Sequence, residues 1–217
     1  MVKLLFRKPL TKTTAKILPL FLSIFLNVSA TAITSEVTTF PPNMVQGTGP
    51  LPYNYRIIDK TIHAGGYPLN PANNFGNSDK QTLEILKYLK SQGIKTIIDL
   101  ENTPWIQNRY QTLINQAGLE RIHIPMNINK TPTAKEWEEI KAAMKEPVYI
   151  HCKWGADRTG AVIGRYLVEE KGYSSEAAWK AVITGGSHAG PLGGLKTGLP
   201  YRSMKLFIQQ ASARKPR

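Results

Sequence analysis

A cysteine and an arginine, six positions apart, lie in a segment whose residue types suit the binding of a phosphate group. The segment is HCKWGADRTG, residues 151–160. Residues 148–150 before it have the apolar character of a short buried strand, and a helical pattern follows it. In a loop between a strand and a helix, backbone N–H groups and the positive end of the helix dipole can surround one tetrahedral anion.

Four side chains of this segment are predicted to take part in phosphoryl transfer. Arg158 offers a two-pronged guanidinium to phosphate oxygens, where a lysine would act only as a point charge. The positive field of the loop favours the thiolate form of Cys152, which is a nucleophile toward a bound phosphoryl group. Thr159 can hydrogen-bond Cys152 and help it to leave in a second step. His151 is expected to orient the loop and not to act as a base, because a thiolate needs none.

The residues between the cysteine and the arginine are predicted to bind the substrate. Gly155 lets the backbone approach the phosphate closely, and the N–H groups around it, including that of Ala156, can point at the anion. Lys153 adds positive charge at the floor of the pocket. Trp154 is expected either to stack on an aromatic ring of the substrate or to pack under the loop.

Cys152 is the only cysteine of the 217 residues. It therefore has no partner for an intramolecular disulfide, and an idle thiol is a hazard in an oxidising compartment. This favours a chemical role for the residue. The alternative is a small buried hydrophobic side chain at the end of a strand.

The segment resembles the signature of the protein tyrosine and dual-specificity phosphatase superfamily, His-Cys-x5-Arg-Ser/Thr. The match is complete at His151, Cys152, Arg158 and Thr159. The loop is most similar to that of bacterial members with Cys-Lys-x-Gly-x-Asp-Arg-Thr-Gly, and the resemblance covers about residues 53–213. It implies a cysteinyl-phosphate intermediate, and we expect neither a cofactor nor a metal.

One part of the pattern of this superfamily is missing. Its members usually supply an aspartic acid from a loop about thirty residues before the cysteine, to protonate the leaving group. Here that loop reads PMNINKTP, residues 125–132, and has Asn127 and Asn129 but no carboxylate. Either asparagine can instead hold the attacking water in the second step.

Three carboxylates are candidates for the missing acid. Asp157 lies inside the loop, where myotubularin-type and Sac-type lipid phosphatases, which the Asp-Arg-Thr sequence resembles, are thought to keep their acid. Asp99 and Glu101 lie at the end of a predicted buried strand and can reach the site. Asp157 can alternatively form an ion pair or a helix cap. If no strong acid is present, the enzyme should be slow on alkyl phosphates but still cleave esters with good leaving groups, such as aryl phosphates.

The first 32 residues have the three parts of a secretory signal peptide. Five positive charges precede an apolar run at residues 17–28, and Ser-Ala-Thr-Ala follows. We expect cleavage and a periplasmic or secreted protein; the alternative is a membrane anchor formed by residues 17–28. Residues 33–52 are predicted to be a linker or N-terminal arm, and residues 53–217 the phosphatase domain.

The net charge of +13 would fall by five, to +8, on removal of that segment. A basic surface of this size suits an anionic substrate and permits contact with an anionic membrane surface. The lysines are scattered and form no arginine-rich arm, zinc spacing or aromatic-basic repeat, so nucleic acid is not expected as a partner. We expect a monomer.

Strands and helices alternate along the chain, which predicts an α/β fold: a single domain with a central mixed, mostly parallel sheet flanked by helices. A hairpin is expected at residues 55–64, ended by Gly65 and Gly66. Further strands are expected at 94–100, 121–124 and 148–150. Helices are expected at 78–92, 103–118, 133–145, 159–170, 174–183 and 200–213, with a glycine-rich loop at 185–198.

Together these features predict an exported phosphatase acting on phosphate monoesters. The substrate is expected to be a phosphoprotein, such as one with phosphotyrosine, or a phosphoinositide or inositol phosphate. Two other functions fit parts of the pattern. One is a phosphate-binding module without turnover, and the other is a rhodanese-like sulfur transferase, which also uses a lone loop cysteine.

Overall fold

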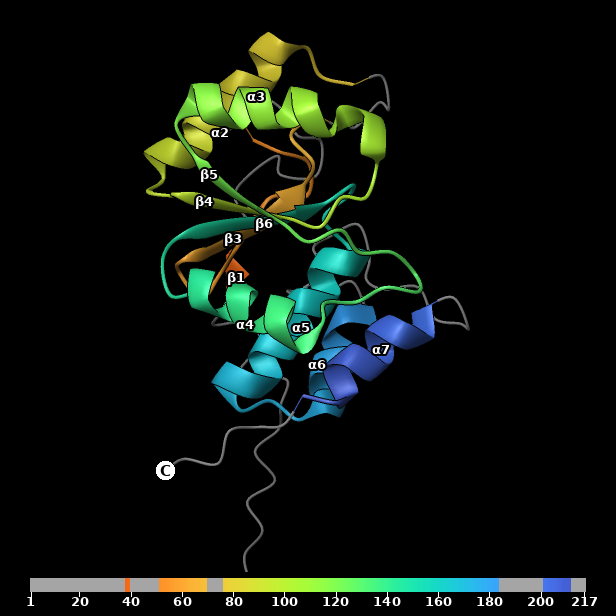
Figure 1. Cartoon of the computed structure of the whole chain (residues 1–217). Helices are drawn as coiled ribbons and strands as arrows, with labels where there is room; N and C mark the ends of the chain where they lie inside the picture. Colours follow the sequence, from red (N-terminus) through yellow and green to blue (C-terminus); the bar gives the residue numbers. More distant parts are fainter. Residues whose placement is uncertain (1–37, 40–50, 70–75, 184–200, 212–217) are drawn as a thin grey trace, which may run out of the picture.

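Among the residues that the computed structural model describes, 38–39, 51–69, 76–183 and 201–211, six strands form one mixed sheet (Figure 1). The predicted signal peptide, most of the predicted arm and the glycine-rich loop lie outside these ranges. The arm contributes β1 (Thr38–Thr39), which pairs with β2. None of the described helices combines the length and apolar character needed to cross a bilayer.

The strands follow the order β1-β2-β3-β6-β4-β5 across the sheet. The first three are antiparallel, whereas β3, β6, β4 and β5 are parallel to one another. The carboxyl ends of these four strands therefore lie along one edge, with β6 between β3 and β4. Their bounds are Arg56–Ile58 for β2, Ile62–Gly66 for β3, Thr96–Asp99 for β4, Glu120–His123 for β5 and Val148–Cys152 for β6.

Helices cover both faces of the sheet, as Figure 1 shows. One face carries α2 (Asp79–Ser91) and α3 (Gln107–Ala117), the latter preceded by a 3-10 turn, Pro104–Ile106. The other carries α4 (Ala134–Ala143), α5 (Asp157–Lys171), α6 (Ser175–Ile183) and α7 (Arg202–Gln209). The predicted α/β fold, with a mixed sheet between helices, is confirmed.

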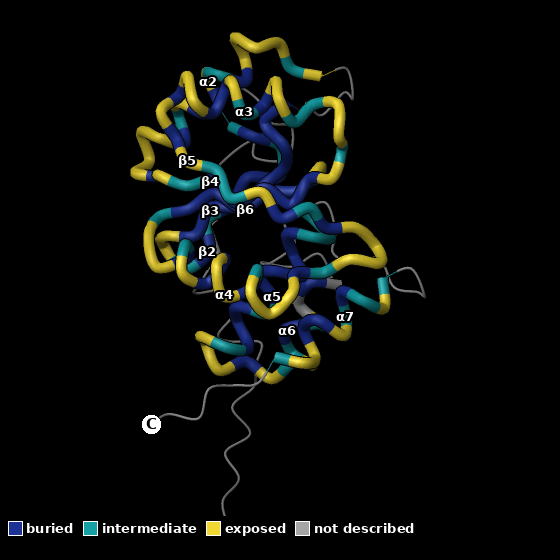
Figure 2. Tube along the Cα trace, in the orientation of Figure 1, coloured by how far each residue is buried: buried dark blue, intermediate teal, exposed yellow. Residues whose placement is uncertain are grey.

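Two hydrophobic cores lie on opposite faces of the sheet, and successive strand residues alternate between them. Ile97 and Tyr149 belong to the core under α2 and α3, whereas Ile98 and Ile150 belong to the core under α4 to α7. This is the two-residue period of a β-strand. Figure 2 shows the buried central strands, β6 among them, between helices with exposed outer residues, while the edge strand β5 is partly exposed. The central strand β6 is fully buried, so the residue at its end is held rigidly.

The sequence signals for helix ends are confirmed at several positions. Thr133 forms the predicted capping box with Glu136 at the start of α4, and Ser78 forms one with Gln81 at the start of α2. Gly118 ends α3 in the left-handed conformation, with φ 66°. These caps satisfy backbone groups at helix ends that packing alone leaves unpaired.

The pairing of β2 with β3 ends at Ala64, so Gly65 and Gly66 end the hairpin as predicted, but they do not end the strand. Both belong to β3 and pair with His151 and Cys152 of β6. The glycines are required for close packing and not for a turn. A Cβ atom on Gly65 would lie 2.6 Å from the hydroxyl oxygen of Tyr149, which donates a hydrogen bond to the Gly66 carbonyl at 2.5 Å.

The hairpin of β2 and β3 contains a buried histidine. The ring of His63 is 5% exposed, and its Nδ1 lies 2.5 Å from the hydroxyl oxygen of Tyr55. Burial lowers the pKa of His63 to about 4. The folded protein therefore holds this side chain neutral at pH values where it is charged in the unfolded chain.

We expect the free energy of unfolding to fall when the pH is lowered from about 7 to about 5. Below the ordinary histidine pKa the unfolded chain binds a proton that folded His63 does not bind until the pH approaches 4. Urea unfolding at the two pH values should show a loss of at most about 2 kcal/mol from this residue. The His63→Gln variant should lose less on acidification; an equal loss would contradict this account.

Candidate active site

The predicted phosphate-binding loop lies at the carboxyl edge of the sheet. Cys152 is the last residue of β6 and is 2% exposed. The loop then turns into α5, which begins at Asp157, two residues earlier than the sequence predicted. Asp157 and Arg158 therefore lie in the first turn of the helix, close to its positive end. The structure brings the predicted nucleophile, the loop and the arginine together.

Gly155 fits against the neighbouring strand because it has no side chain. Its φ angle is 70°, and a Cβ atom would lie 2.2 Å from the carbonyl carbon of Gly65. No other residue type fits this position without moving β3 or the loop. That Gly155 lets the backbone approach the phosphate stays a prediction. The close contact of Gly155 with Gly65 of β3 is a second reason for a glycine here, and the sequence did not indicate it.

The guanidinium of Arg158 is fixed from two neighbouring strand ends. Its Nη1 donates to the carbonyl oxygens of Leu100 at 3.1 Å and Met126 at 3.3 Å and to Oδ1 of Asn102 at 3.2 Å, while Nη2 pairs with Glu101 Oε2 at 3.3 Å. Burial acts to lower the pKa of Arg158, but Cys152 and Glu101 together outweigh it, so the pKa is raised. The arginine is therefore cationic and held in one place.

Glu101 forms an ion pair with Arg158, whereas the sequence indicated it only as a candidate for the general acid. Its carboxylate is 2% exposed. Besides the ion pair with Arg158, it accepts hydrogen bonds from the backbone N–H of Asn102 at 3.0 Å and from the hydroxyl of Thr103 at 2.7 Å. Protonating it would break the ion pair. Glu101 is therefore suited to positioning Arg158 rather than to proton transfer.

The carboxylate of Asp99 is also paired with an arginine, in this case Arg121. Its Oδ2 accepts from Arg121 Nε at 3.0 Å and Nη2 at 2.5 Å, and its Oδ1 accepts from the backbone N–H of Glu101 at 2.7 Å. The side chain has no solvent exposure. The geometry therefore disfavours both strand-end alternatives for the missing acid, and the acid role of Asp157 stays a prediction.

His151 is completely buried beside the loop. Its Nε2 lies 3.0 Å from the hydroxyl oxygen of Tyr110, and its ring lies 5.1 Å from that of Tyr67. Burial lowers the pKa of His151, and the charge of Asp99 opposes this shift only in part. A neutral ring packed between tyrosines is compatible with a role of His151 in orienting the loop, but that role stays a prediction.

Thr159 differs from its expectation in one respect. Its hydroxyl is buried and makes no hydrogen bond to any described residue, so the expected bond to Cys152 is not formed in this structure. The side chain is enclosed at the first turn of α5. A role in the second step stays a prediction.

Asp157 and Arg158 line one cavity of about 270 Å³ at this edge of the sheet. Asn127 and Ile128 contribute to it from the loop after β5, which has no carboxylate. The sequence did not indicate the wall formed by α7. The full lining is Asn102, Asn127, Ile128, Asp157, Arg158, Tyr201 and Met204.

Lys153 and Trp154 lie on the outer side of the loop. The ammonium of Lys153, which is exposed, lies 5.7 Å from the centre of the Trp154 ring. That ring packs edge-to-face against Tyr53, with 5.4 Å between centroids. Of the two expectations for Trp154, packing against the protein is the one that this geometry favours.

A comparison with family models decides what kind of protein this is. Residues 61–189 match the family described as DSP-PTPase phosphatase fused to NAD+ kinase. The chain belongs to this phosphatase family. The match contains the strands β6 and β4, the loop and Arg158, so the resemblance inferred from the loop sequence is confirmed.

Curated relatives extend this result. The chain is 31% identical to NAD kinase 2, chloroplastic, of Arabidopsis thaliana over 100 residues, which are 42% of this chain and 10% of the relative. It is 25% identical to the mouse phosphatidylglycerophosphatase and protein-tyrosine phosphatase 1 over 141 residues, 62% of this chain and 68% of that protein. The chain thus spans about a tenth of the NAD kinase, and most of the smaller phosphatase.

Solved structures share the fold. The structure of TpbA from P. aeruginosa has a TM-score of 0.51 and 18% identity, covering 73% of this chain and 85% of that one. The kinase associated phosphatase has a TM-score of 0.54 and 19% identity, covering 69% of this chain and 86% of its own. Both are phosphatases by name, and their similarity concerns the fold alone.

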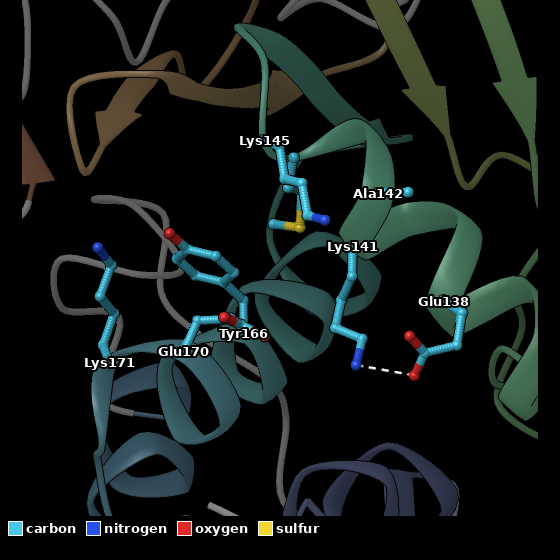
Figure 3. A pocket seen from close by; sticks show the side chains of 8 residues that line it. Glu138, Lys141, Ala142, Lys145, Tyr166, Glu170 and Lys171 are labelled. Atoms are coloured by element: carbon cyan, nitrogen blue, oxygen red, sulfur yellow. Dashed lines mark ion pairs between the residues drawn. The ribbon is translucent and has the colours of Figure 1, made fainter. Parts of the chain in front are cut away.

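A second cavity of about 270 Å³ lies between α4 and α5, near the other end of α5 (Figure 3). Its charges are largely balanced: Lys141 pairs with Glu138 at 2.8 Å and with Glu169 at 3.0 Å. Glu170 in its wall lies twelve residues beyond Arg158 on the same helix, or about 18 Å along the axis. This cavity is therefore separate from the phosphatase loop.

We expect the Glu101→Gln substitution to reduce kcat/KM for an aryl phosphate by about tenfold or more, because Arg158 loses its ionic partner and its fixed position. Steady-state kinetics on the purified protein measure this. Glu169→Gln is the matched control, since the Glu169 carboxylate is also little exposed, at 8%, and pairs with Arg165 at 2.8 Å, but lies away from the loop. An unchanged kcat/KM in Glu101→Gln would show that Arg158 needs no such support.

Proposed function

We propose that the protein is an exported phosphatase that hydrolyses phosphate monoesters through a cysteinyl-phosphate intermediate. The observation that carries this proposal is the placement of Cys152 at the end of the central strand, with Arg158 fixed in the first turn of the following helix. Membership of the phosphatase family supports phosphatase activity. The same family match argues against a sulfur transferase.

In the first step the Cys152 thiolate attacks phosphorus, and the bond from phosphorus to the ester oxygen breaks. The leaving oxygen takes a proton from Asp157. In the second step water attacks the phosphocysteine, gives a proton to the Asp157 carboxylate, and the sulfur leaves as a thiolate with inorganic phosphate as product. Backbone N–H groups of the loop and Arg158 stabilise the charge on the phosphoryl oxygens in both steps.

Two observations support Asp157 as the acid. It lines the same cavity as Arg158, facing the loop in which the superfamily usually carries its aspartate and this chain has Asn127. The other candidates, Asp99 and Glu101, are bound to arginines. Asp157 is the carboxylate among the residues that line this cavity, and we propose that the departing ester oxygen takes its proton there.

The proposed substrates are phosphoproteins, including those with phosphotyrosine, or phosphoinositides and inositol phosphates. One relative is named for activity on phosphatidylglycerophosphate and on protein tyrosine, and TpbA has been solved in complex with pTyr. The exposed Lys153 beside the loop suits additional negative charge on either kind of substrate. Export is proposed from the sequence of residues 1–32, with membrane anchoring by residues 17–28 as the alternative.

We expect the wild-type protein to hydrolyse a small aryl phosphate and the Cys152→Ser variant to show only the uncatalysed rate, because the serine hydroxyl is not ionised at neutral pH. Release of the phenol measures this. The variant should still bind inorganic phosphate. If the wild type also shows no hydrolysis but binds phosphate, the protein is a binding module, and thiosulfate cleavage without phosphatase activity would indicate a sulfur transferase.

The Asp157→Asn substitution should affect esters unequally. We expect about a 100-fold loss of kcat on an alkyl phosphate, whose leaving group needs a proton, and less than about a tenfold loss on an aryl phosphate. Parallel kinetics on the two esters measure the ratio. Asp79→Asn, at the exposed start of α2, is the control and should change neither rate. Equal losses on both esters would remove Asp157 from the acid role.

A further inference from the structure

A loop that turns its N–H groups toward one anion turns carbonyl groups outward, and these need donors of their own. Two such donors come from the segment around the hairpin. The backbone N–H of Tyr67 donates to the carbonyl of Lys153 at 3.1 Å. The side-chain amide of Asn54 donates to the carbonyl of Trp154 at 3.2 Å, across 100 positions of sequence. The outer side of the loop is therefore bound to the start of β2 and the end of β3.

Asn54 is placed for this contact by an unusual backbone. It has no solvent exposure, and its φ angle of 55° lies in the left-handed region, which asparagine tolerates better than most residues. The carbonyl of the preceding Tyr53 accepts a hydrogen bond from Gly66 N–H at 2.6 Å. The segment before β2 is thus fixed against β3 at the point where the loop passes.

A buried cation holds the same asparagine. Nη1 of Arg56 donates to the Asn54 carbonyl at 3.1 Å, and Arg56 has no solvent exposure. Burial lowers its pKa to about 10, and the negative charge of Cys152 opposes this, so the side chain is protonated at neutral pH. Burying a charge costs free energy unless it is well bonded. Here the buried Arg56 adds a positive charge near Cys152, and its hydrogen bond fixes Asn54, the residue that holds the loop.

We propose that Asn54, held by Arg56, is a positioning residue that keeps the loop of Cys152 in its anion-binding conformation. The inference rests on the proposed phosphatase function for the identity of the anion. Because the loop binds the phosphoryl group both in the bound substrate and in the transition state, a loosened loop should weaken phosphate binding and raise KM more than it lowers kcat.

Two substitutions at this position separate the amide from the backbone. Asn54→Gly keeps the left-handed conformation and removes the amide. Asn54→Asp keeps the shape and places an acceptor against the Trp154 carbonyl. Lys60→Gly is the matched control, because Lys60 also has a positive φ, of 66°, but is exposed in the hairpin turn. Arg56→Met replaces the arginine by an apolar side chain of similar length. It therefore tests whether the hydrogen bond from Arg56 to the Asn54 carbonyl is needed to hold Asn54 in place.

The test is calorimetric titration of each full-length variant with inorganic phosphate, together with aryl phosphate kinetics and a thermal melt. We expect phosphate affinity to fall about fivefold to tenfold in Asn54→Gly, the equivalent of one lost hydrogen bond, and further in Asn54→Asp. KM should rise by a similar factor and kcat should change less. Arg56→Met should change in the same direction, and Lys60→Gly should match the wild type.

Unchanged phosphate affinity and KM in Asn54→Gly would overturn the inference, even if its melting temperature falls, because Asn54 would then stabilise the fold without positioning the loop. Failure of the wild type to bind phosphate would also overturn it. If the wild type binds phosphate but does not turn over the ester, the proposed function fails. The ratio of phosphate affinities between wild type and Asn54→Gly still decides the positioning role.

Discussion

The contact of two glycine backbones, Gly155 of the loop against Gly65 of β3, is the constraint on which the site depends. A single Cβ atom at position 155 would approach the Gly65 carbonyl carbon to 2.2 Å. This close approach brings the loop within hydrogen-bond distance of the Tyr67 backbone and of Asn54. The place of the loop is thus set by a neighbouring strand as well as by its own sequence.

Parallel pairing explains why two acidic residues that looked like catalysts hold arginines. The ends of β4, β5 and β6 lie side by side, so Asp99 meets Arg121 of β5, and Glu101 meets Arg158 after β6. Each carboxylate neutralises a cation that is largely withdrawn from water, and removing either partner would leave a buried charge uncompensated. Asp157 lies in the first turn of a helix and lines the cavity.

The fold and the loop were readable from sequence because they depend on local patterns: a buried strand, a glycine, a helix start and capping boxes such as Thr133 with Glu136. Gly65 and Gly66 end the hairpin with β2 as predicted, but their pairing with β6 was missed, because glycine serves both chain reversals and close packing and only the register with β6 distinguishes them. Contacts across the chain, such as Asn54 with Trp154 or Tyr201 with the cavity, leave no short-range signal.

Residues at the start of α7 form one wall of the cavity, so changes in the shape of the cavity can occur separately from changes in the reacting residues. Tyr201 and Met204 lie more than forty positions after the loop, and between them the Ser203 hydroxyl donates to the carbonyl of Ile128 on the facing loop. Substitutions along this last helix can reshape the space above Arg158 and leave the reacting atoms in place. Descendants of one ancestral enzyme can therefore diverge in substrate while inheriting an unaltered nucleophile.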